Sequence, residues 1–113
     1  MNTMTKPDSK RAYDRYDCCF SISWARFNST RSIQGRMMNY SQNGLYFESK
    51  SALPQGMSVL VRVQKNLAAD TACEIKEGFR SLALGEVKWC EEFISEGSVY
   101  YGVGVKYYLP DYY

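Results

Sequence analysis

The first side chains that could do chemistry are two arginines four residues apart, Arg11 and Arg15, with Lys10 directly before them. Each guanidinium presents a planar fork of N–H donors that can hold two phosphate oxygens, or the O6 and N7 acceptors of guanine. The guanidinium plane can also stack on a base. Two such groups could therefore clamp a ligand that carries both phosphates and guanines. The alternative is a solvated basic segment, since nearby aspartates balance its charge.

A second group of polar residues, Asn39 and Ser41, precedes an Asn-Gly pair that ends in Gly44. If residues 39–41 are extended, the two polar side chains point to the same face. The Asn amide offers a donor and an acceptor to the Watson–Crick edge of a base, and the Ser hydroxyl can donate to a phosphate or accept from a base amine. Gly44 would let a ligand approach the backbone. The alternative is a tight hairpin at Asn43-Gly44, where both positions tolerate positive φ, with the Asn and Ser side chains satisfying local backbone groups.

The sequence contains no set of residues typical of catalysis or of metal binding. It has no histidine, which is the commonest general base, and its carboxylates are scattered along the chain. Ser41 lacks the G-x-S-x-G surroundings of a nucleophilic serine. The four cysteines include no C-x-x-C pair and are expected to act as small apolar side chains: Cys18, Cys19, Cys73 and Cys90. We therefore expect a binding protein rather than an enzyme, without a metal or a cofactor.

The 113 residues fit one domain, for which 45% hydrophobic and 23% charged residues are ordinary values. The net charge of +2 is too small to indicate binding to nucleic acid through charge alone. No apolar run approaches about 18 residues, and the polar N-terminus lacks the apolar core of a signal peptide. These features predict a cytoplasmic protein with a flexible tail over residues 1–9 and a folded domain over residues 10–113.

Alternation of apolar and polar residues dominates the rest of the chain and indicates β-strands. Phe20, Ile22 and Trp24, for example, share one face of the first segment. Turn residues separate the segments, and only residues 66–80 carry no clear pattern. The expected strands cover residues 19–27, 32–41, 44–50, 58–65, 82–92 and 99–109. Short strands with turns between them are typical of an all-β sandwich or barrel.

The arginine pair before the first strand and the N-x-S-x-x-G pattern at the end of the second together resemble the PilZ domain family, bacterial receptors for cyclic di-GMP. The family pattern is R-x-x-x-R followed, some tens of residues later, by [D/N]-x-S-x-x-G. All of its positions are matched, by Arg11, Arg15, Asn39, Ser41 and Gly44. The "GEVKW" and "YGVGVKYY" segments also look like strands of the family's sheet, so the resemblance covers roughly residues 10–108.

The resemblance implies a six-stranded antiparallel β-barrel of the split-barrel type, with cyclic di-GMP on its outer surface. The two arginines would contact guanine and phosphate, Asn39 and Ser41 would hold the base and neighbouring groups, and Gly44 would permit the turn. Lys10 would influence whether one ligand molecule or a stacked pair binds. Ligand binding would order the N-terminal arginine segment, and a protein effector in motility, pilus or polysaccharide control would read the changed surface.

The chain departs from the family pattern in two places. Asn39 stands where the family can have Asp, whose carboxylate accepts from two guanine donors at once, whereas an amide has one acceptor oxygen. Many family members also continue into a C-terminal helix, and Pro110 disfavours such a helix directly after the last expected strand.

Two other functions fit the sequence. A small β-barrel can bind single-stranded nucleic acid with exposed aromatic rings as stacking platforms, for which the candidates are Tyr40, Tyr46, Tyr100 and Tyr108. Against this function, the Lys and Arg residues form no continuous stripe in the sequence. The other function is that of a PilZ-like adaptor that binds a protein partner without using the nucleotide site.

Overall fold

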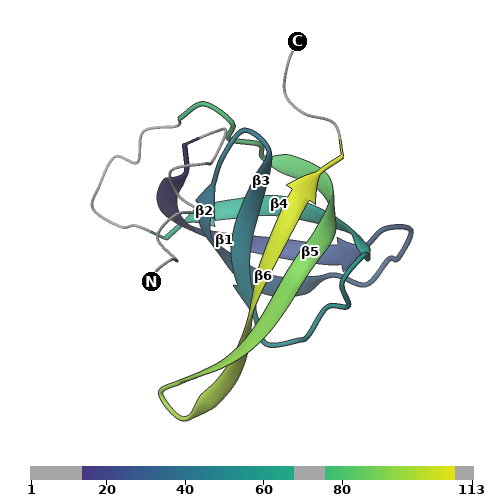
Figure 1. Cartoon of the computed structure of the whole chain (residues 1–113), viewed down its shortest axis with the longest axis vertical. Helices are drawn as coiled ribbons and strands as arrows, with labels where there is room; N and C mark the ends of the chain where they lie inside the picture. Colours follow the sequence, from purple (N-terminus) through teal and green to yellow (C-terminus); the bar gives the residue numbers. More distant parts are fainter. Residues whose placement is uncertain (1–13, 68–75, 109–113) are drawn as a thin grey trace, which may run out of the picture.

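The computed structural model describes residues 14–67 and 76–108, which form six strands that close into an antiparallel barrel (Figure 1). The strands are β1 (Tyr16–Arg26), β2 (Ile33–Tyr40), β3 (Gly44–Ser49), β4 (Ser58–Asn66), β5 (Leu82–Ser95) and β6 (Ser98–Tyr107). Their order around the barrel is β1-β2-β3-β6-β5-β4. The expected all-β fold and its six antiparallel strands are confirmed. Lys10, Arg11 and the tail over residues 1–9 lie outside the described residues.

The barrel is held together by apolar side chains from alternate positions of its strands. Phe20, Ile22 and Trp24 are at most 5% exposed, as the alternation in β1 predicts. Each of the strands β2 to β6, and the loop that contains Leu53, also contributes to the core. These residues are Met37, Tyr40, Leu45, Phe47, Leu53, Val59, Val61, Ala83, Val87, Val103, Val105 and Tyr107. Burial of one large side chain of this kind contributes about 1.5–3 kcal/mol, so the core provides the main favourable contribution to folding.

The β2–β3 connection is a hairpin, but its backbone differs from the expected one. Neither Asn43 nor Gly44 is among the described residues with positive φ. The loop has three residues, 41–43, and the Ser41 N–H donates to the Gly44 carbonyl over 2.8 Å. The tight hairpin is confirmed, but the positive φ that the Asn-Gly pair allows is not adopted. The pairing of Tyr40 with Leu45 places Ser41 opposite Gly44, so residues 42–43 make the turn and Gly44 already belongs to β3.

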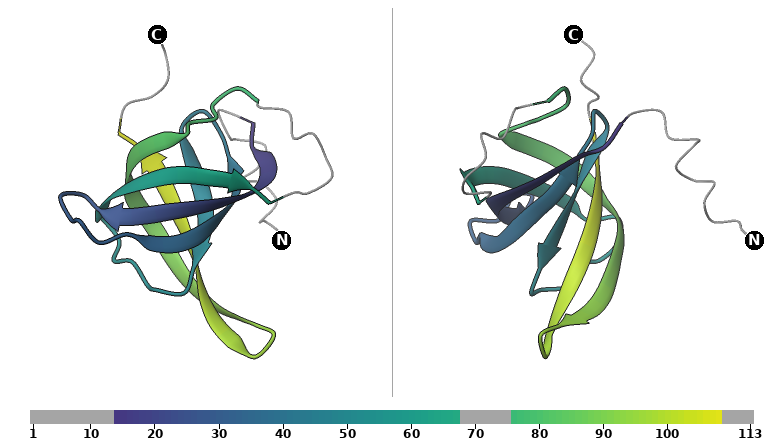
Figure 2. Two further views of the ribbon diagram at one scale, coloured as in Figure 1. Left: turned by 180° about the vertical axis from the view of Figure 1, so that it is seen from behind. Right: turned by 90° about the vertical axis from the view of Figure 1, so that its left-hand side faces the viewer.

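The β5–β6 hairpin extends beyond the barrel (Figures 1 and 2). Its turn residues Glu96 and Gly97 do have positive φ, 51° and 78°, and Ser95 pairs with Ser98 directly before and after them. This conformation suits a two-residue hairpin, because it matches the twist of the strands. Beyond the barrel no core lies beneath the sheet, and Ile94 on β5 is accordingly 71% exposed.

Residues 76–80 cover one end of the barrel, in the part of the chain where the sequence shows no clear pattern. The Phe79 ring packs at 5.3 Å from the Phe20 ring and at 5.5 Å from the Tyr40 ring. The Lys76 N–H donates to the Tyr40 hydroxyl over 3.0 Å. The irregular segment is thus anchored to the barrel by aromatic contacts. Within the described ranges, the chain forms no helix of the length and hydrophobicity needed to cross a membrane.

Candidate functional site

The strand register brings the separated motif residues together on the outside of the barrel. Tyr16 pairs with Tyr40, so Arg15, one residue before Tyr16, continues this antiparallel register towards Ser41. Gly44 begins β3 at the other end of the three-residue loop. Arg15 and the motif residues of the β2–β3 hairpin therefore meet at one edge of the barrel surface.

A row of directly paired residues crosses the outer surface from this edge. Asn39 on β2 pairs with Tyr46 on β3, and Tyr46 pairs with Gly104 on β6. Gly104 in turn pairs with Trp89 on β5. Paired residues of antiparallel strands point to the same face, so the row carries the Asn39 amide and two aromatic rings on one surface.

These residues line an open pocket of about 440 Å³. This volume lies within the range of roughly 300–1,000 Å³ that is usual for small-molecule sites. The pocket is lined by all the motif residues that the structure describes, together with aromatic and charged residues of β3, β5 and β6: Arg15, Asn39, Ser41, Asn43, Gly44, Leu45, Tyr46, Lys88, Trp89, Glu91, Glu92, Phe93, Gly102, Gly104, Val105 and Lys106.

Two glycines of β6 let the aromatic rings lie against its backbone. A Cβ on Gly104 would come closer than 3.0 Å to atoms of the Trp89 ring, and a Cβ on Gly102 would do the same to the Tyr46 ring. The two rings stack at 5.5 Å between centroids and 27° between planes. Trp89 remains 43% exposed. The pocket thus has an aromatic surface on which a planar group can stack.

The motif loop is held by its own polar groups. The Ser41 hydroxyl donates to the Asn43 side-chain oxygen over 2.8 Å and accepts from the Asn43 N–H over 3.3 Å. The Asn43 carbonyl accepts from the N–H of Tyr107 on β6 over 2.9 Å. The interpretation of Ser41 as a residue that satisfies local groups is confirmed, and the hydrogen bonds fix the shape of the pocket wall that Ser41 provides.

Two glycines hold this loop close to the rest of the barrel. A Cβ on Gly44 would come closer than 3.0 Å to the Val105 carbonyl oxygen of β6. Gly78 has φ +94°, and its Cβ would lie 2.7 Å from the Ser41 carbonyl. Gly44 is therefore required by the close approach of a neighbouring strand, and residues 76–80 support the loop from behind.

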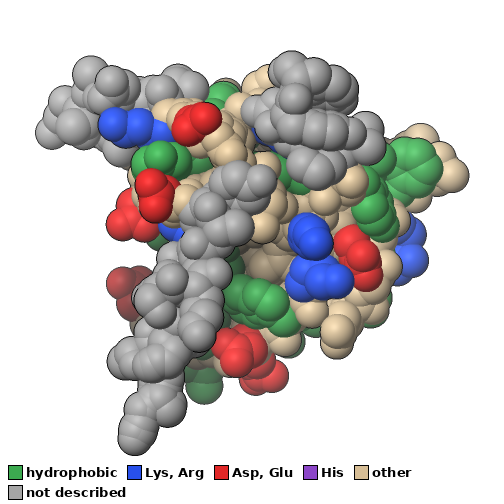
Figure 3. Space-filling view, turned by 45° about the horizontal axis from the view of Figure 1, so that its top comes forward, with side chains coloured by type: hydrophobic (Ala, Val, Ile, Leu, Met, Phe, Trp, Pro, Cys, Tyr) green, Lys and Arg blue, Asp and Glu red, His purple; other side chains and the backbone are tan. Residues whose placement is uncertain are grey.

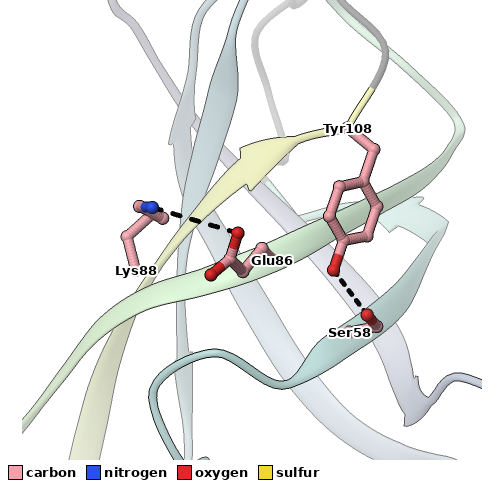
Figure 4. A network of polar contacts seen from close by, with 4 residues as sticks. All are labelled: Ser58, Glu86, Lys88 and Tyr108. Atoms are coloured by element: carbon pink, nitrogen blue, oxygen red, sulfur yellow. Dashed lines mark hydrogen bonds and ion pairs between the residues drawn. The ribbon is translucent and has the colours of Figure 1, made fainter.

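The cations that line the pocket lie at one end of it. Arg15, Lys88 and Lys106 are exposed cations that line it, and Gly44 and Lys106 pair in the row next to the aromatic one. Lys88 lies 3.9 Å from Glu86 on the same strand, and nearby Ser58 and Tyr108 share a hydrogen bond that ties the end of β6 to β4 (Figure 4). The cations create one end of the pocket that favours an anion.

The opposite end of the pocket is acidic. Glu48, Gly102 and Glu91 pair across β3, β6 and β5 in the row that follows the aromatic one. Burial raises the pKa of the Tyr46 hydroxyl, and the negative charges of Glu48 and Glu91 raise it further. Both carboxylates are therefore close to the aromatic pair, and the pocket passes from cations through aromatic rings to carboxylates.

The structure also corrects and extends the expectations about aromatic residues. Tyr40 is only 2% exposed, so it is no stacking platform, whereas Tyr108 is 45% exposed. On the face drawn in Figure 3, the visible Lys and Arg side chains lie in small groups beside Asp and Glu rather than in a continuous stripe. Sequence reasoning did not identify Trp89 or Glu91 as site residues. The available signal was the G-x-G spacing of Gly102 and Gly104, which leaves one face of a strand without side chains.

Comparison with known proteins gives similarity in structure alone. No family model matches the chain, and neither does any curated protein sequence. The PilZ domain of YcgR from Escherichia coli, solved with c-di-GMP, superposes with a TM-score of 0.60 at 11% identity, over 88% of this chain and 78% of that one. The PlzA protein of Borreliella burgdorferi, solved in complex with c-di-GMP, gives 0.50 at 12% identity, over 85% of this chain and 40% of that one. The closed six-stranded barrel described above thus has the fold of the PilZ domain.

Proposed function

We propose that the protein is a receptor for cyclic di-GMP, which it binds in the outer pocket of the barrel. One observation carries the proposal: Arg15, Asn39, Ser41 and Gly44, from two distant stretches of the sequence, line a single pocket on a barrel with the PilZ fold. The similar domain of YcgR and the PlzA protein were both solved with this ligand.

The pocket provides groups that suit each part of such a ligand. Arg15, Lys88 and Lys106 suit the two phosphates, since each is an exposed cation at the pocket. The exposed ring of Trp89, backed by Tyr46, suits a guanine base, because stacking of a base on an aromatic side chain is worth about 1–3 kcal/mol. Asn39 adds an amide that can meet a base edge.

The arginine pair of the motif completes the proposed site. Arg11 lies four residues before Arg15, and four residues of extended chain span at most about 14 Å. Arg11 is therefore tethered within reach of a ligand that Arg15 contacts, and Lys10, the residue directly before Arg11 in the sequence, is proposed to act beside it. Fixing residues 11–15 would cost roughly 1–2 kcal/mol per residue, whereas each hydrogen bond to a charged group returns about 1.5–3 kcal/mol. Several bonds from both arginines must therefore form together.

Docking of the arginine segment would change the surface beside β1, and we propose that a protein effector reads this change in the cytoplasm. Hydrogen exchange of the N-terminal amides, measured with and without cyclic di-GMP, tests this step. Slower exchange over residues 10–16 in the complex is expected. Unchanged exchange in a ligand-saturated sample would contradict ordering of the segment while leaving nucleotide binding intact.

Calorimetric titration with cyclic di-GMP tests the receptor function itself. Saturable binding is expected, with a loss of well over about tenfold in Arg15→Ala, because a charge-assisted contact to phosphate or guanine disappears. Arg62→Ala is the matched control, since Arg62 is an exposed arginine on β4 that does not line the pocket. The absence of heat and of amide shifts in the wild type at high micromolar ligand would refute the proposal. Binding of oligonucleotides with a steep salt dependence, without preference for cyclic di-GMP, would instead support a single-stranded nucleic-acid binder.

A further inference from the structure

The carboxylates at the acidic end of the pocket repel phosphates, so they must contact another part of the ligand. Glu91 follows Trp89 by two residues on β5, which places both side chains on the same face of the strand. Both line the pocket. A base stacked on the Trp89 ring would therefore present one of its edges towards the Glu91 carboxylate.

Of the two glutamates in this row, Glu91 is the one available to a ligand. Glu48 lies 4.0 Å from the Arg36 guanidinium. Glu91 is exposed and has no ion-pair partner within residues 14–67 and 76–108. Glu91 nevertheless pairs with Gly102, against which the Tyr46 ring lies, so the residue is near the aromatic pair. Its charge contributes to the raised pKa of the Tyr46 hydroxyl.

The Watson–Crick edge of guanine matches this carboxylate chemically. Guanine presents two adjacent donors there, the N1–H and the N2 amine, and an ionised carboxylate has two acceptor oxygens and no donor. Adenine presents an acceptor at N1, which a carboxylate repels. Asn39, which replaces the carboxylate that the motif can carry, has only one acceptor oxygen, so it cannot offer a separate oxygen to each donor as a carboxylate does.

We propose that Glu91 determines the specificity for guanine, by accepting hydrogen bonds from N1–H and the N2 amine of the base that stacks on Trp89. This inference rests on the proposed function, since it assigns one residue of the same pocket. The carboxylate that selects the base thus comes from β5, whereas the motif itself provides only an amide at Asn39. Bidentate contacts to a base discriminate by a factor of about 5 to 150.

The test measures the dissociation constants of cyclic di-GMP, cyclic di-IMP and cyclic di-AMP for three proteins: the wild type, Glu91→Gln and Glu96→Gln. Glu96 is an exposed carboxylate at the tip of the same hairpin, outside the pocket, so its substitution removes the same charge without the contact. Since Glu91 is exposed, Glu91→Gln is expected to fold normally, which thermal unfolding checks.

For the wild type we expect tighter binding of cyclic di-GMP than of cyclic di-IMP, which lacks the N2 amine. Glu91→Gln should weaken cyclic di-GMP binding by about 5- to 150-fold and remove most of the preference over the other two ligands. A purely electrostatic role of Glu91 predicts the opposite sign, because loss of a negative charge tightens binding of every dianion. Glu96→Gln should retain the wild-type preference.

The outcomes separate the inference from the function on which it rests. If the wild type binds none of the three nucleotides, the proposed function fails. If the wild type binds cyclic di-GMP and Glu91→Gln keeps both its affinity and its guanine preference, the assignment of Glu91 is overturned and the receptor function stands. Equal weakening of all three ligands would also overturn it, since that result indicates an effect on the pocket rather than on base selection.

Discussion

Substitution of Gly104 by alanine should separate ligand binding from stability. The new methyl group would come closer than 3.0 Å to the Nε1, Cε2 and Cζ2 atoms of Trp89. Trp89 is 43% exposed, so its ring can swing outwards and relieve the clash without moving the barrel backbone. The structural result of Gly104→Ala is therefore a displaced aromatic surface rather than an unfolded protein.

Gly104→Ala should change the free energy of unfolding much less than the free energy of ligand binding. Loss of the Tyr46–Trp89 stack costs about 0.5–1.5 kcal/mol of folding free energy. Replacement of a glycine within a strand by alanine returns about 0.5–1 kcal/mol. The free energy of unfolding should consequently change by at most about 1 kcal/mol. A base that no longer stacks on Trp89 loses about 1–3 kcal/mol of binding, which raises the dissociation constant by about 5- to 150-fold.

Calorimetry with cyclic di-GMP and urea unfolding measure the two quantities on the same preparations. Trp89→Leu serves as reference, and the double variant Gly104→Ala/Trp89→Leu closes a thermodynamic cycle. If Gly104 acts through the ring, the double variant binds no more weakly than Trp89→Leu alone. Full additivity of the two losses, or wild-type affinity in Gly104→Ala, would refute the reasoning.

Three further predictions follow from the loop and its neighbours. Gly44→Ala should lower the free energy of unfolding by about 1–3 kcal/mol in urea titrations, because its Cβ would meet a β6 backbone carbonyl that cannot rotate away; wild-type stability would contradict the close approach. The Tyr46 hydroxyl should ionise above pH 10.0 in an absorbance titration, because burial and, to a smaller extent, the neighbouring carboxylates raise its pKa. The stability that this group contributes is complete below pH 10.0 and is lost as the pH rises through the folded-state pKa, and Tyr46→Phe should remove this loss. Gly78→Ala should destabilise the protein more than Gly56→Ala, because both glycines have positive φ, 94° and 92°, but only the methyl group on Gly78 meets Ser41; equal Tm values for the two variants would contradict this packing.

The strands could be predicted because their signal is local. The alternation of apolar and polar residues in β1 predicts which side chains face inwards, and Phe20, Ile22 and Trp24 are buried as it predicts. The motif predicted that Asn39 and Ser41 belong to one site, and both line the same pocket. Each inference needed only neighbouring residues and the geometry of an extended chain.

The remaining features depend on pairing between distant residues. The register of β2 shifts between Met37 and Asn39 against both neighbouring strands, and downstream of the shift Tyr40 points into the core. A bulge of this kind reverses the phase of alternation and leaves no unambiguous mark in the sequence. Likewise, the Trp89 ring finds its place opposite Gly104 only once β5 and β6 are in register. Residues that depend on such contacts could not be assigned from local patterns.

The pocket wall draws on residues from Arg15 to Lys106, and the barrel closes only when β1 meets β4. A nascent chain on the ribosome therefore cannot complete the site until β6 has been synthesised, because the first and last contributors are about as far apart in synthesis order as the described chain allows. Non-local pairing of this sort forms late and slowly. Only a fully assembled domain would consequently bind the proposed ligand, and truncated or misfolded copies would not respond to it.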